Sequence, residues 1–200
     1  MRKTAPVFFF AILSAAGLFA QVQDLQDALN NRQVSLSANG SGGSSGASVT
    51  GFLQNATSGT LRINTVIRNG LYLRNEGAGQ NMAATGVYLE SGEYYFDGEN
   101  AFIELAGKAR TPVIFIAFCA DFEKENPSPD ESFSLAAMPG AIRAIVSKIS
   151  RYMADHPDDD AVIAAQIALW ISQGETAASI GGKFAFQPED EALAGVIAGY

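Results

Sequence analysis

The stretch VIFIAFCAD, residues 113–121, lies between two parts of the chain that have different sequence patterns. Its first six residues form an unbroken apolar run, which is typical of a buried strand, and the run ends at Cys119. Upstream, short segments rich in β-branched and aromatic residues alternate with turn-forming segments at 55–59, 69–70 and 75–79. The expected strands are residues 48–53, 60–67, 71–73, 86–89, 101–105 and 113–118. Short strands at such close spacing predict a β-sandwich-like half.

Downstream of this stretch, apolar residues recur at helical spacing. One continuous stripe predicts an amphipathic helix that Pro139 opens and that ends at His156. The residues of this stripe are Ile142, Ile145, Val146, Ile149, Tyr152 and Met153. A second helix is expected to follow, with the acidic residues 158–160 at its N-cap and first turn, and a third to begin at Pro188. We therefore expect an α+β fold, in which an N-terminal β-sandwich-like half packs against a C-terminal helical half.

Residues 1–20 have the pattern of a secretory signal peptide: a short basic start, an apolar run and small residues at Ala16 and Ala20. The apolar run is too short to cross a bilayer, and no later segment approaches the roughly 20 apolar residues that a spanning helix needs. We expect an exported chain that does not span a membrane and is secreted, periplasmic or at the cell surface. Its β-rich region is residues 21–118 and its helical region is residues 119–200.

The charge of the chain limits its partners. There are 13 Lys and Arg side chains against 21 Asp and Glu, a formal net charge of -8. Removing Arg2 and Lys3 with the signal peptide leaves 11 basic against 21 acidic side chains, a net charge of -10. Nucleic-acid phosphates require a basic surface, so this composition argues against a nucleic-acid partner.

Conventional catalytic and cofactor-binding patterns are sparse. His156 is the only histidine, so a Ser-His-Asp or Cys-His set would depend on it alone, which makes a hydrolase the weakest of the functions considered. Metal ligands of the His and Cys kinds are nearly absent, and the acidic residues at 155–160 lack the spacing of a calcium loop. The glycines do not form a phosphate-binding loop. We expect no metal, no cofactor and no enzymatic turnover.

Two residues stand out from this background. Gln166 lies between Ile163 and Trp170 on the face of the second predicted helix that should be buried. A buried carboxamide without a hydrogen bond costs about 1–3 kcal/mol, so Gln166 needs a partner. Cys119 is the only cysteine, so it forms no intrachain disulfide, and its ordinary interpretation is a buried, unreactive thiol. The residues Tyr72, Tyr88, Tyr94 and Tyr95 are expected to pack in the sheet.

The sequence around these two residues resembles the bacterial thioester-domain family of surface adhesins. One motif is Phe118-Cys119 followed by Asp121 and an Asn126-Pro127 turn, and the other is Gln166-Ile167-Ala168-Leu169-Trp170. The resemblance covers about residues 113–171. It implies an internal thioester between Cys119 and Gln166, and a partner that is an amine on a host or surface protein. The supporting residues that it implies are Phe118, Asp121, Ala168 and Trp170.

Two functions are therefore open from the sequence. The first is an exported thioester-domain-like adhesion protein whose Cys119–Gln166 bond acylates amines on a target surface. The second is a non-covalent structural or binding module of the cell envelope. In that module Cys119 and Gln166 are core residues, and Gln166 links the helix to the sheet by hydrogen bonds.

Overall fold

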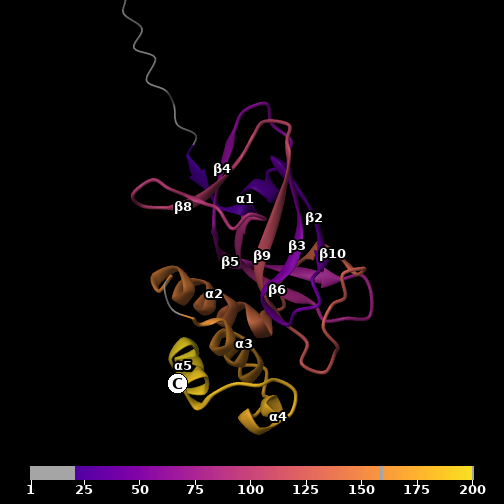
Figure 1. Ribbon diagram of the computed structural model, residues 1–200, viewed down its shortest axis with the longest axis vertical. Coiled ribbons are helices and arrows are strands. Elements are labelled where there is room, and N and C mark those ends of the chain that lie inside the picture. The colour runs from indigo at the N-terminus through magenta and orange to yellow at the C-terminus, as the bar shows by residue number, and fades with distance from the viewer. Residues whose placement is uncertain (1–20, 158–159, 200) are drawn as a thin grey trace, which may run out of the picture.

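A β-rich region containing a closed six-stranded antiparallel barrel is followed by helices that gather at one end of the barrel (Figure 1). The computed structural model describes residues 21–157 and 160–199. The α+β fold expected from the sequence is confirmed. The expected signal peptide, residues 1–20, lies outside the described residues.

The barrel has the strand order β10-β2-β3-β9-β6-β5, and β10 pairs with both β2 and β5 to close it. Its strands are β2 (Val34–Gly40), β3 (Ser45–Asn55), β5 (Val66–Asn75), β6 (Met82–Leu89), β9 (Arg110–Cys119) and β10 (Ser132–Ala136). The sequence predicted a sandwich and did not predict β10. Alternating apolar residues specify which face of a strand is buried, whereas closure depends on the tilt and stagger of all the strands together.

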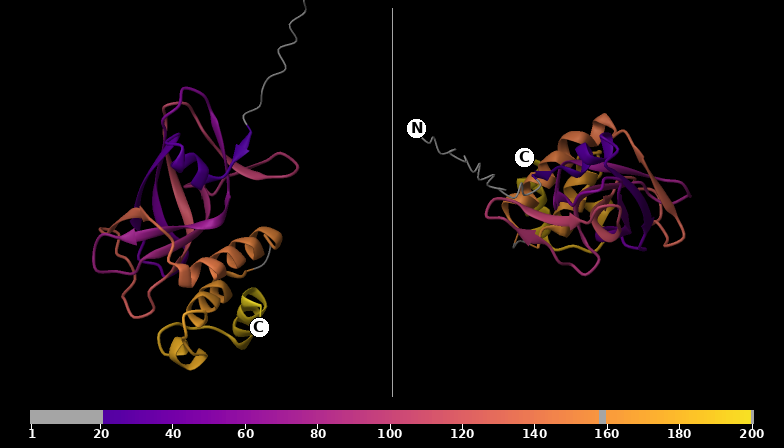
Figure 2. Two further views of the ribbon diagram at one scale, coloured as in Figure 1. Left: turned by 180° about the vertical axis from the view of Figure 1, so that it is seen from behind. Right: turned by 90° about the horizontal axis from the view of Figure 1, so that it is seen from above.

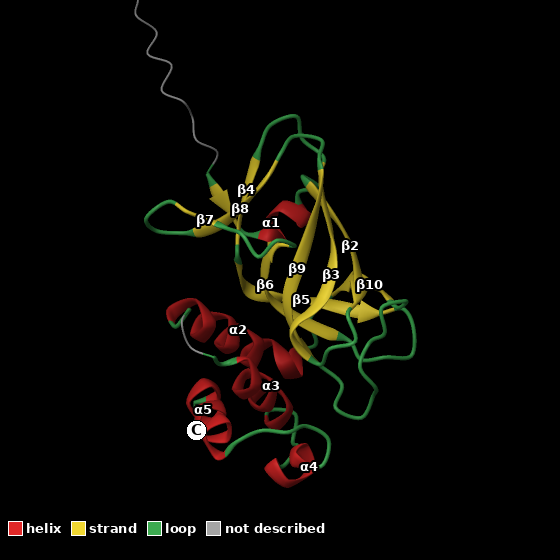
Figure 3. Ribbon diagram, in the orientation of Figure 1, coloured by secondary structure: helices red, strands yellow, loops and turns green. Residues whose placement is uncertain are grey.

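A smaller sheet with the order β1-β4-β8-β7 lies beside the barrel (Figure 3). Its strands are β1 (Val22–Gln23), β4 (Leu61–Asn64), β7 (Tyr95–Phe96) and β8 (Ala101–Leu105). The helix α1 (Leu25–Asn30) follows β1 and buries Leu25 and Ala28. The single strand expected at 60–67 is divided at Thr65, whose backbone N–H and side-chain hydroxyl both donate to Ala101 O. This division sends β4 to the small sheet and β5 to the barrel.

The segment Asn69-Gly70, expected to be a turn, lies inside β5 at a register shift between Val66 and Leu71. Gly70 has a φ of +66°, a conformation that favours glycine. A Cβ atom at this position would overlap the side chain of Val146 in the first long helix. Glycine at this position therefore allows the irregular strand conformation and also lets the helix pack closely against the barrel.

Four helices form the C-terminal region: α2 (Gly140–Asp155), α3 (Val162–Ile171), α4 (Ala177–Gly181) and α5 (Pro188–Ala198). The predicted apolar stripe of α2 is confirmed, because Ile142, Ile145, Val146 and Ile149 are buried. The expected start of α5 at Pro188 is also confirmed. The N-cap of α3 is Ala161, so Asp160 does not cap this helix as expected, and residues 158–159 lie outside the described part of the chain.

The helix α3 is apolar around its whole circumference, and every residue from 164 to 170 is buried. Such a helix must be covered on all sides. It contacts β3 and β9 on one side and α2, α4 and α5 on the others (Figure 2). The C-terminal helices therefore cover α3 and hold it against the end of the barrel. Within residues 21–157 and 160–199, no helix combines the length and the apolar character needed to cross a membrane.

Candidate functional site

Cys119 is the last residue of β9, at the end of the barrel that faces α3. Its side chain is fully buried, and it stands opposite Met82 in the β6–β9 ladder. Its backbone N–H donates to Ser44 O at 3.0 Å, just before β3 begins. The unbroken apolar run that precedes Cys119 thus places the thiol at the strand end and away from solvent.

Gln166 reaches Cys119 from the middle of α3. The backbone N–H of Cys119 donates to Gln166 Oε1 at 2.8 Å, and Gln166 Nε2 donates to Cys119 O at 2.9 Å. The N–H and C=O of one strand residue point the same way, so a single carboxamide pairs with both, much as a neighbouring strand does. The expected burial of Gln166 and its need for a partner are confirmed, and the partner is the main chain of the cysteine.

Among the described residues, two side-chain atoms lie within 4 Å of the Cys119 sulfur as possible hydrogen-bond acceptors. Met82 Sδ lies 3.6 Å from it, and Asn126 Oδ1 lies 3.9 Å from it. Asn126 is exposed, and its Nδ2 also donates to Gly42 O at 3.3 Å, so it connects two loops over the thiol. Burial, together with the negative charge of Asp121, raises the pKa of the Cys119 thiol to about 12. The thiol is therefore protonated at neutral pH.

Among the described residues, Asp121 forms no hydrogen bond with the Cys119 thiol. Its Oδ2 accepts from the backbone N–H of Asn81 at 3.0 Å and from Asn81 Nδ2 at 2.6 Å. Lys124 Nζ forms an ion pair with it at 3.1 Å. Asp121 thus holds the chain that leaves β9 against the start of β6, and it acts on the thiol through its charge.

The remaining sequence-predicted residues form the apolar surroundings of the pair. Phe118 and Ala168 are fully buried, and Trp170 is almost so. The Trp170 ring makes edge-to-face contacts with Phe122 and Phe184, at centroid distances of 5.1 and 5.5 Å. Trp170 Nε1 has no hydrogen-bond partner within the described residues. These contacts bury the Trp170 ring one helical turn beyond Gln166.

A loop at residues 121–131 covers the other side of the site, and Glu131 anchors it. The Glu131 carboxylate accepts from the backbone N–H groups of Ala78, Gly79 and Ser128 at 2.9 Å each, and from Asn75 Nδ2 at 3.2 Å. The bonds from Gly79, Ser128 and Asn75 hold the pKa of Glu131 below its ordinary value. The ionised carboxylate ties this loop to the β5–β6 connection.

Several residues of the site were missed in the sequence. Met82 and Glu131 come from segments that carry no motif, and only the barrel brings them to Cys119 or to its covering loop. Asn126 was recognised as part of a turn and not as a neighbour of the sulfur. The expectation that Tyr94 and Tyr95 pack in the sheet is wrong in part, because each is more than half exposed, at 55% and 52%.

Within the described residues, the surroundings of His156 contain no catalytic set and no metal site. His156 is exposed at the end of α2, where its ring stacks on Tyr152 at a centroid distance of 4.2 Å. No cluster of His, Cys, Asp or Glu that would hold a metal occurs in the described ranges.

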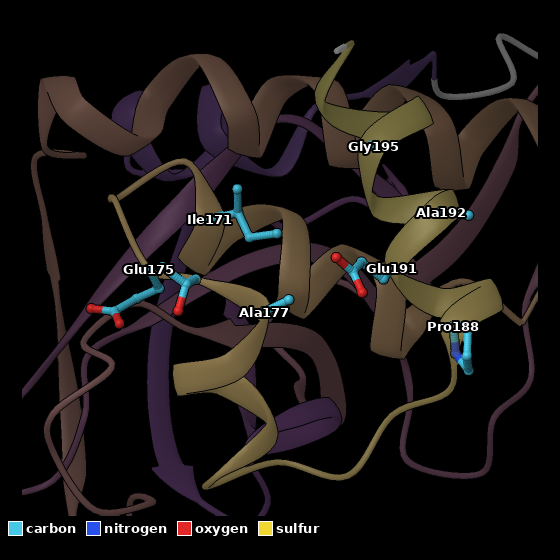
Figure 4. Close-up of a pocket in the computed structure, with 8 residues that line it drawn as sticks. Ile171, Glu175, Ala177, Pro188, Glu191, Ala192 and Gly195 are labelled. Atoms are coloured by element: carbon cyan, nitrogen blue, oxygen red, sulfur yellow. The ribbon is translucent and has the colours of Figure 1, made fainter.

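Two cavities lie away from the thiol. One, of about 590 Å³, opens between the end of α3, α4 and α5, with Glu175 and Glu191 among its lining residues (Figure 4). The other, of about 1090 Å³, is a groove between α2 and the β-rich region. Neither is lined by Cys119 or Gln166.

Comparison with known proteins adds no family to this description, since no family model, curated protein or solved structure matches the chain.

Proposed function

We propose that this chain is an exported adhesion domain in which Cys119 and Gln166 form an internal thioester that acylates an amine on a target surface. The observation that carries the proposal is the pair of hydrogen bonds between the Gln166 carboxamide and the main chain of Cys119. The resemblance of the two motifs to bacterial thioester domains supports the same assignment. Secretion, or a place in the periplasm or on the cell surface, belongs to the proposal.

Bond formation is an acyl transfer within the chain. The Cys119 thiolate attacks the side-chain carbonyl carbon of Gln166, a C–S bond forms, and the C–N bond breaks. The amide nitrogen leaves as ammonia after taking up the proton that the thiol has lost. Gln166 Oε1 already accepts from the Cys119 N–H at 2.8 Å, so a donor is positioned where negative charge develops during the attack.

The sulfur must approach the carbonyl carbon for this reaction. In the structure its neighbours are Met82 and Asn126, whereas the carboxamide lies against the main chain of the same cysteine. Rotation about the Cα–Cβ bond of Cys119 moves the sulfur between staggered positions and leaves the strand in place. The proposal therefore requires that rotation of this side chain bring the sulfur to the carbonyl carbon.

The raised pKa of the thiol slows the reaction without preventing it. With a pKa of about 12, only about one Cys119 in 10⁵ is a thiolate at pH 7. Fixed proximity within a molecule is equivalent to concentrations of about 10⁵–10⁸ M, which offsets a deficit of that size. The bond needs to form once in the lifetime of each molecule, so a slow reaction is sufficient.

The surroundings of the pair suit a stored acyl donor. Phe118 precedes Cys119 in β9 and Trp170 lies one turn beyond Gln166 in α3. Both are buried, and an apolar, water-poor setting protects a thioester from hydrolysis. On the other side Asn126 is exposed and lies over the sulfur, which makes it the nearest route for an incoming amine. The amine attacks the carbonyl carbon, a C–N bond forms, and Cys119 leaves as a thiol that carries the amine proton. One covalent link forms per molecule.

The second candidate is a non-covalent structural or binding module of the envelope. The observation that favours it is that both polar atoms of the Gln166 carboxamide are already hydrogen-bonded, as in a core residue that links a helix to a strand. A buried thiol with a raised pKa is equally ordinary for such a core.

Intact-mass measurement of freshly purified protein separates the two functions. The thioester predicts a mass lower by one ammonia than that of the processed sequence. Because native Cys119 is buried, thiols are counted in denaturant at mildly acidic pH with N-ethylmaleimide, which still reacts with thiols there, and the closed form should give none. Methylamine should then add to the protein and release one thiol. A full mass with one free thiol in every preparation would contradict the thioester and favour the structural module.

Two controls make the result specific. Cys119→Ser keeps the size of the side chain but removes the sulfur, so it should give the full mass and no methylamine adduct. Peptide mapping should place the adduct on Gln166 and leave Gln173 unmodified, although Gln173 lies in the same part of the chain and its Nε2 also donates to a backbone carbonyl.

A further inference from the structure

The groove of about 1090 Å³ lies between the β4–β5 junction, the β7–β8 hairpin and one face of α2. Its volume is slightly above the range of about 300–1,000 Å³ that is common for small-molecule sites. Cys119 and Gln166 do not line it. An inference about this groove therefore does not rest on thioester chemistry.

Two exposed aromatic side chains stand at one wall of the groove. Tyr94 is 55% exposed and Phe96 is 67% exposed, and both line the groove. Tyr95, between them in sequence, instead stacks on Phe102 at a centroid distance of 5.7 Å. The Tyr94 ring is supported edge-on by Tyr88 at 6.0 Å. Exposed aromatic rings grouped at one wall of a groove are a feature of binding surfaces.

The polar lining offers both hydrogen-bond donors and acceptors. The side chains of Arg68, Arg151 and Glu99 line the groove, and none of them forms a hydrogen bond or ion pair with another described residue. Asp155 lines it as well. The lining thus carries two guanidinium groups and two carboxylates, so neither sign of charge predominates among these side chains. A strongly anionic ligand such as a nucleic acid therefore has no electrostatic advantage here.

We propose that this groove binds a neutral saccharide of a few sugar units. A sugar ring presents a C–H face that packs on aromatic rings such as Tyr94 and Phe96. Its hydroxyl groups both donate and accept, so they match the unpaired guanidinium and carboxylate groups of the lining. A purely apolar ligand would leave those groups desolvated and unpaired, which opposes its binding.

The test uses the purified chain and an array of four neutral oligosaccharides: N-acetyllactosamine, chitotriose, maltotriose and mannotriose. Sialylated and sulfated N-acetyllactosamine serve as anionic counterparts. We expect binding to at least one neutral oligosaccharide and no stronger binding to its anionic counterpart. Cys119→Ser should bind equally well, since no covalent step is involved. Failure to bind any of the four neutral oligosaccharides, or binding to anionic forms alone, would overturn the proposal.

Variants assign the binding to this groove. Phe96→Ala and Tyr94→Ala should each weaken binding about tenfold, which is the effect of one lost aromatic contact. Val196→Ala is the matched control, because Val196 is also 67% exposed but lies on α5, outside the groove. Thermal unfolding confirms that each variant is folded. Binding that Phe96→Ala and Tyr94→Ala leave unchanged would also overturn the proposal.

Discussion

The helices meet the β-rich region in two places, along α3 and along α2. At the α3 boundary, Cys119 and Gln166 are fully buried, and both polar atoms of the Gln166 carboxamide are paired. At the α2 boundary, a groove remains open, and the side chains of Arg68 and Arg151 have no hydrogen-bond or ion-pair partner among the described residues. In the first region the Cys119–Gln166 pair is buried and its carboxamide is fully paired, whereas the second region is exposed and has charged side chains without partners among the described residues.

The same two strands serve both regions. β6 and β9 contribute Met82 and Cys119 to the sealed boundary, and Thr85 and Ile116 to the open groove. The difference comes from the helices, because α3 is apolar all round and α2 has only one apolar face. An apolar helix excludes water and favours protected chemistry, whereas the polar edge of an amphipathic helix leaves room for a soluble ligand.

The largest expected effect is on thiol reactivity. Burial raises the pKa of Cys119 from 9.0 to about 12, so native protein with a free thiol should react with iodoacetamide at neutral pH about a thousandfold more slowly than unfolded protein. A groove cysteine, Asn69→Cys in a Cys119→Ser background, should react at nearly the unfolded rate because Asn69 is exposed. Equal native rates for the two thiols would remove the distinction between sealed and open regions. Methylamine-treated protein is used so that the thiol is free.

Truncation of aromatic residues should have opposite consequences in the two regions. Trp170→Ala leaves a cavity beside Phe122 and Phe184 and should lower the free energy of unfolding by about 3–5 kcal/mol. Phe96→Ala in the groove should change it by no more than about 0.5 kcal/mol, because its ring is 67% exposed. Urea unfolding followed by far-UV circular dichroism measures both, and comparable losses would show that the groove wall is part of the core.

The paired carboxamide can be tested in the same way. In a Cys119→Ser background, which keeps the carboxamide intact, Gln166→Leu removes the donor to the backbone carbonyl of residue 119 and one acceptor of its N–H, at a cost of about 1–3 kcal/mol. Gln173→Leu is the matched control, since its amide also donates to a backbone carbonyl but its side chain is exposed, and it should cost less than about 0.5 kcal/mol. If the two substitutions lowered the free energy of unfolding by the same amount, the hydrogen bonds of Gln166 would contribute no more to stability than a surface contact does.

The smallest expected effect concerns pH and the loop over the thiol. Hydrogen bonds from Gly79, Ser128 and Asn75 lower the pKa of Glu131 from 4.5 in the folded state. The carboxylate therefore stabilises the fold at pH above 4.5, and this contribution is lost as the pH falls through its lowered pKa. Glu131→Gln should lower Tm at pH 7, and the difference from the unsubstituted protein should shrink in acid.

The control for the pH experiment is Glu123→Gln. Glu123 lies in the same loop, but its ion pair with Lys183 is exposed and should contribute little. A Tm difference for Glu131→Gln that persisted unchanged in acid would mean that its ionised carboxylate does not anchor the loop.

The outcome at individual residues shows which features local sequence specifies. The apolar stripe of α2, the start of α5 at Pro188 and the strand at 101–105 were all predicted, because helical and strand periodicity are read within a few neighbouring residues. The burial of Gln166 was predicted from the same periodicity, and its need for a hydrogen bond followed from the cost of a buried carboxamide.

Features that depend on pairing across the chain were not accessible in this way. The short strand β10 closes the barrel through partners in β2 and β5. Gly70 lies in an irregular part of β5, where a side chain would overlap Val146 of α2. The placement of Met82 and Asn126 at the thiol has the same origin. Local periodicity by itself determined the α+β class, the helices α2, α3 and α5, and the buried face of α2. Only the tertiary structure decided how the barrel closes, which residues surround Cys119 and where the groove lies. Each of these depends on contacts between segments that are far apart in the sequence, and a local pattern of residues does not specify such contacts.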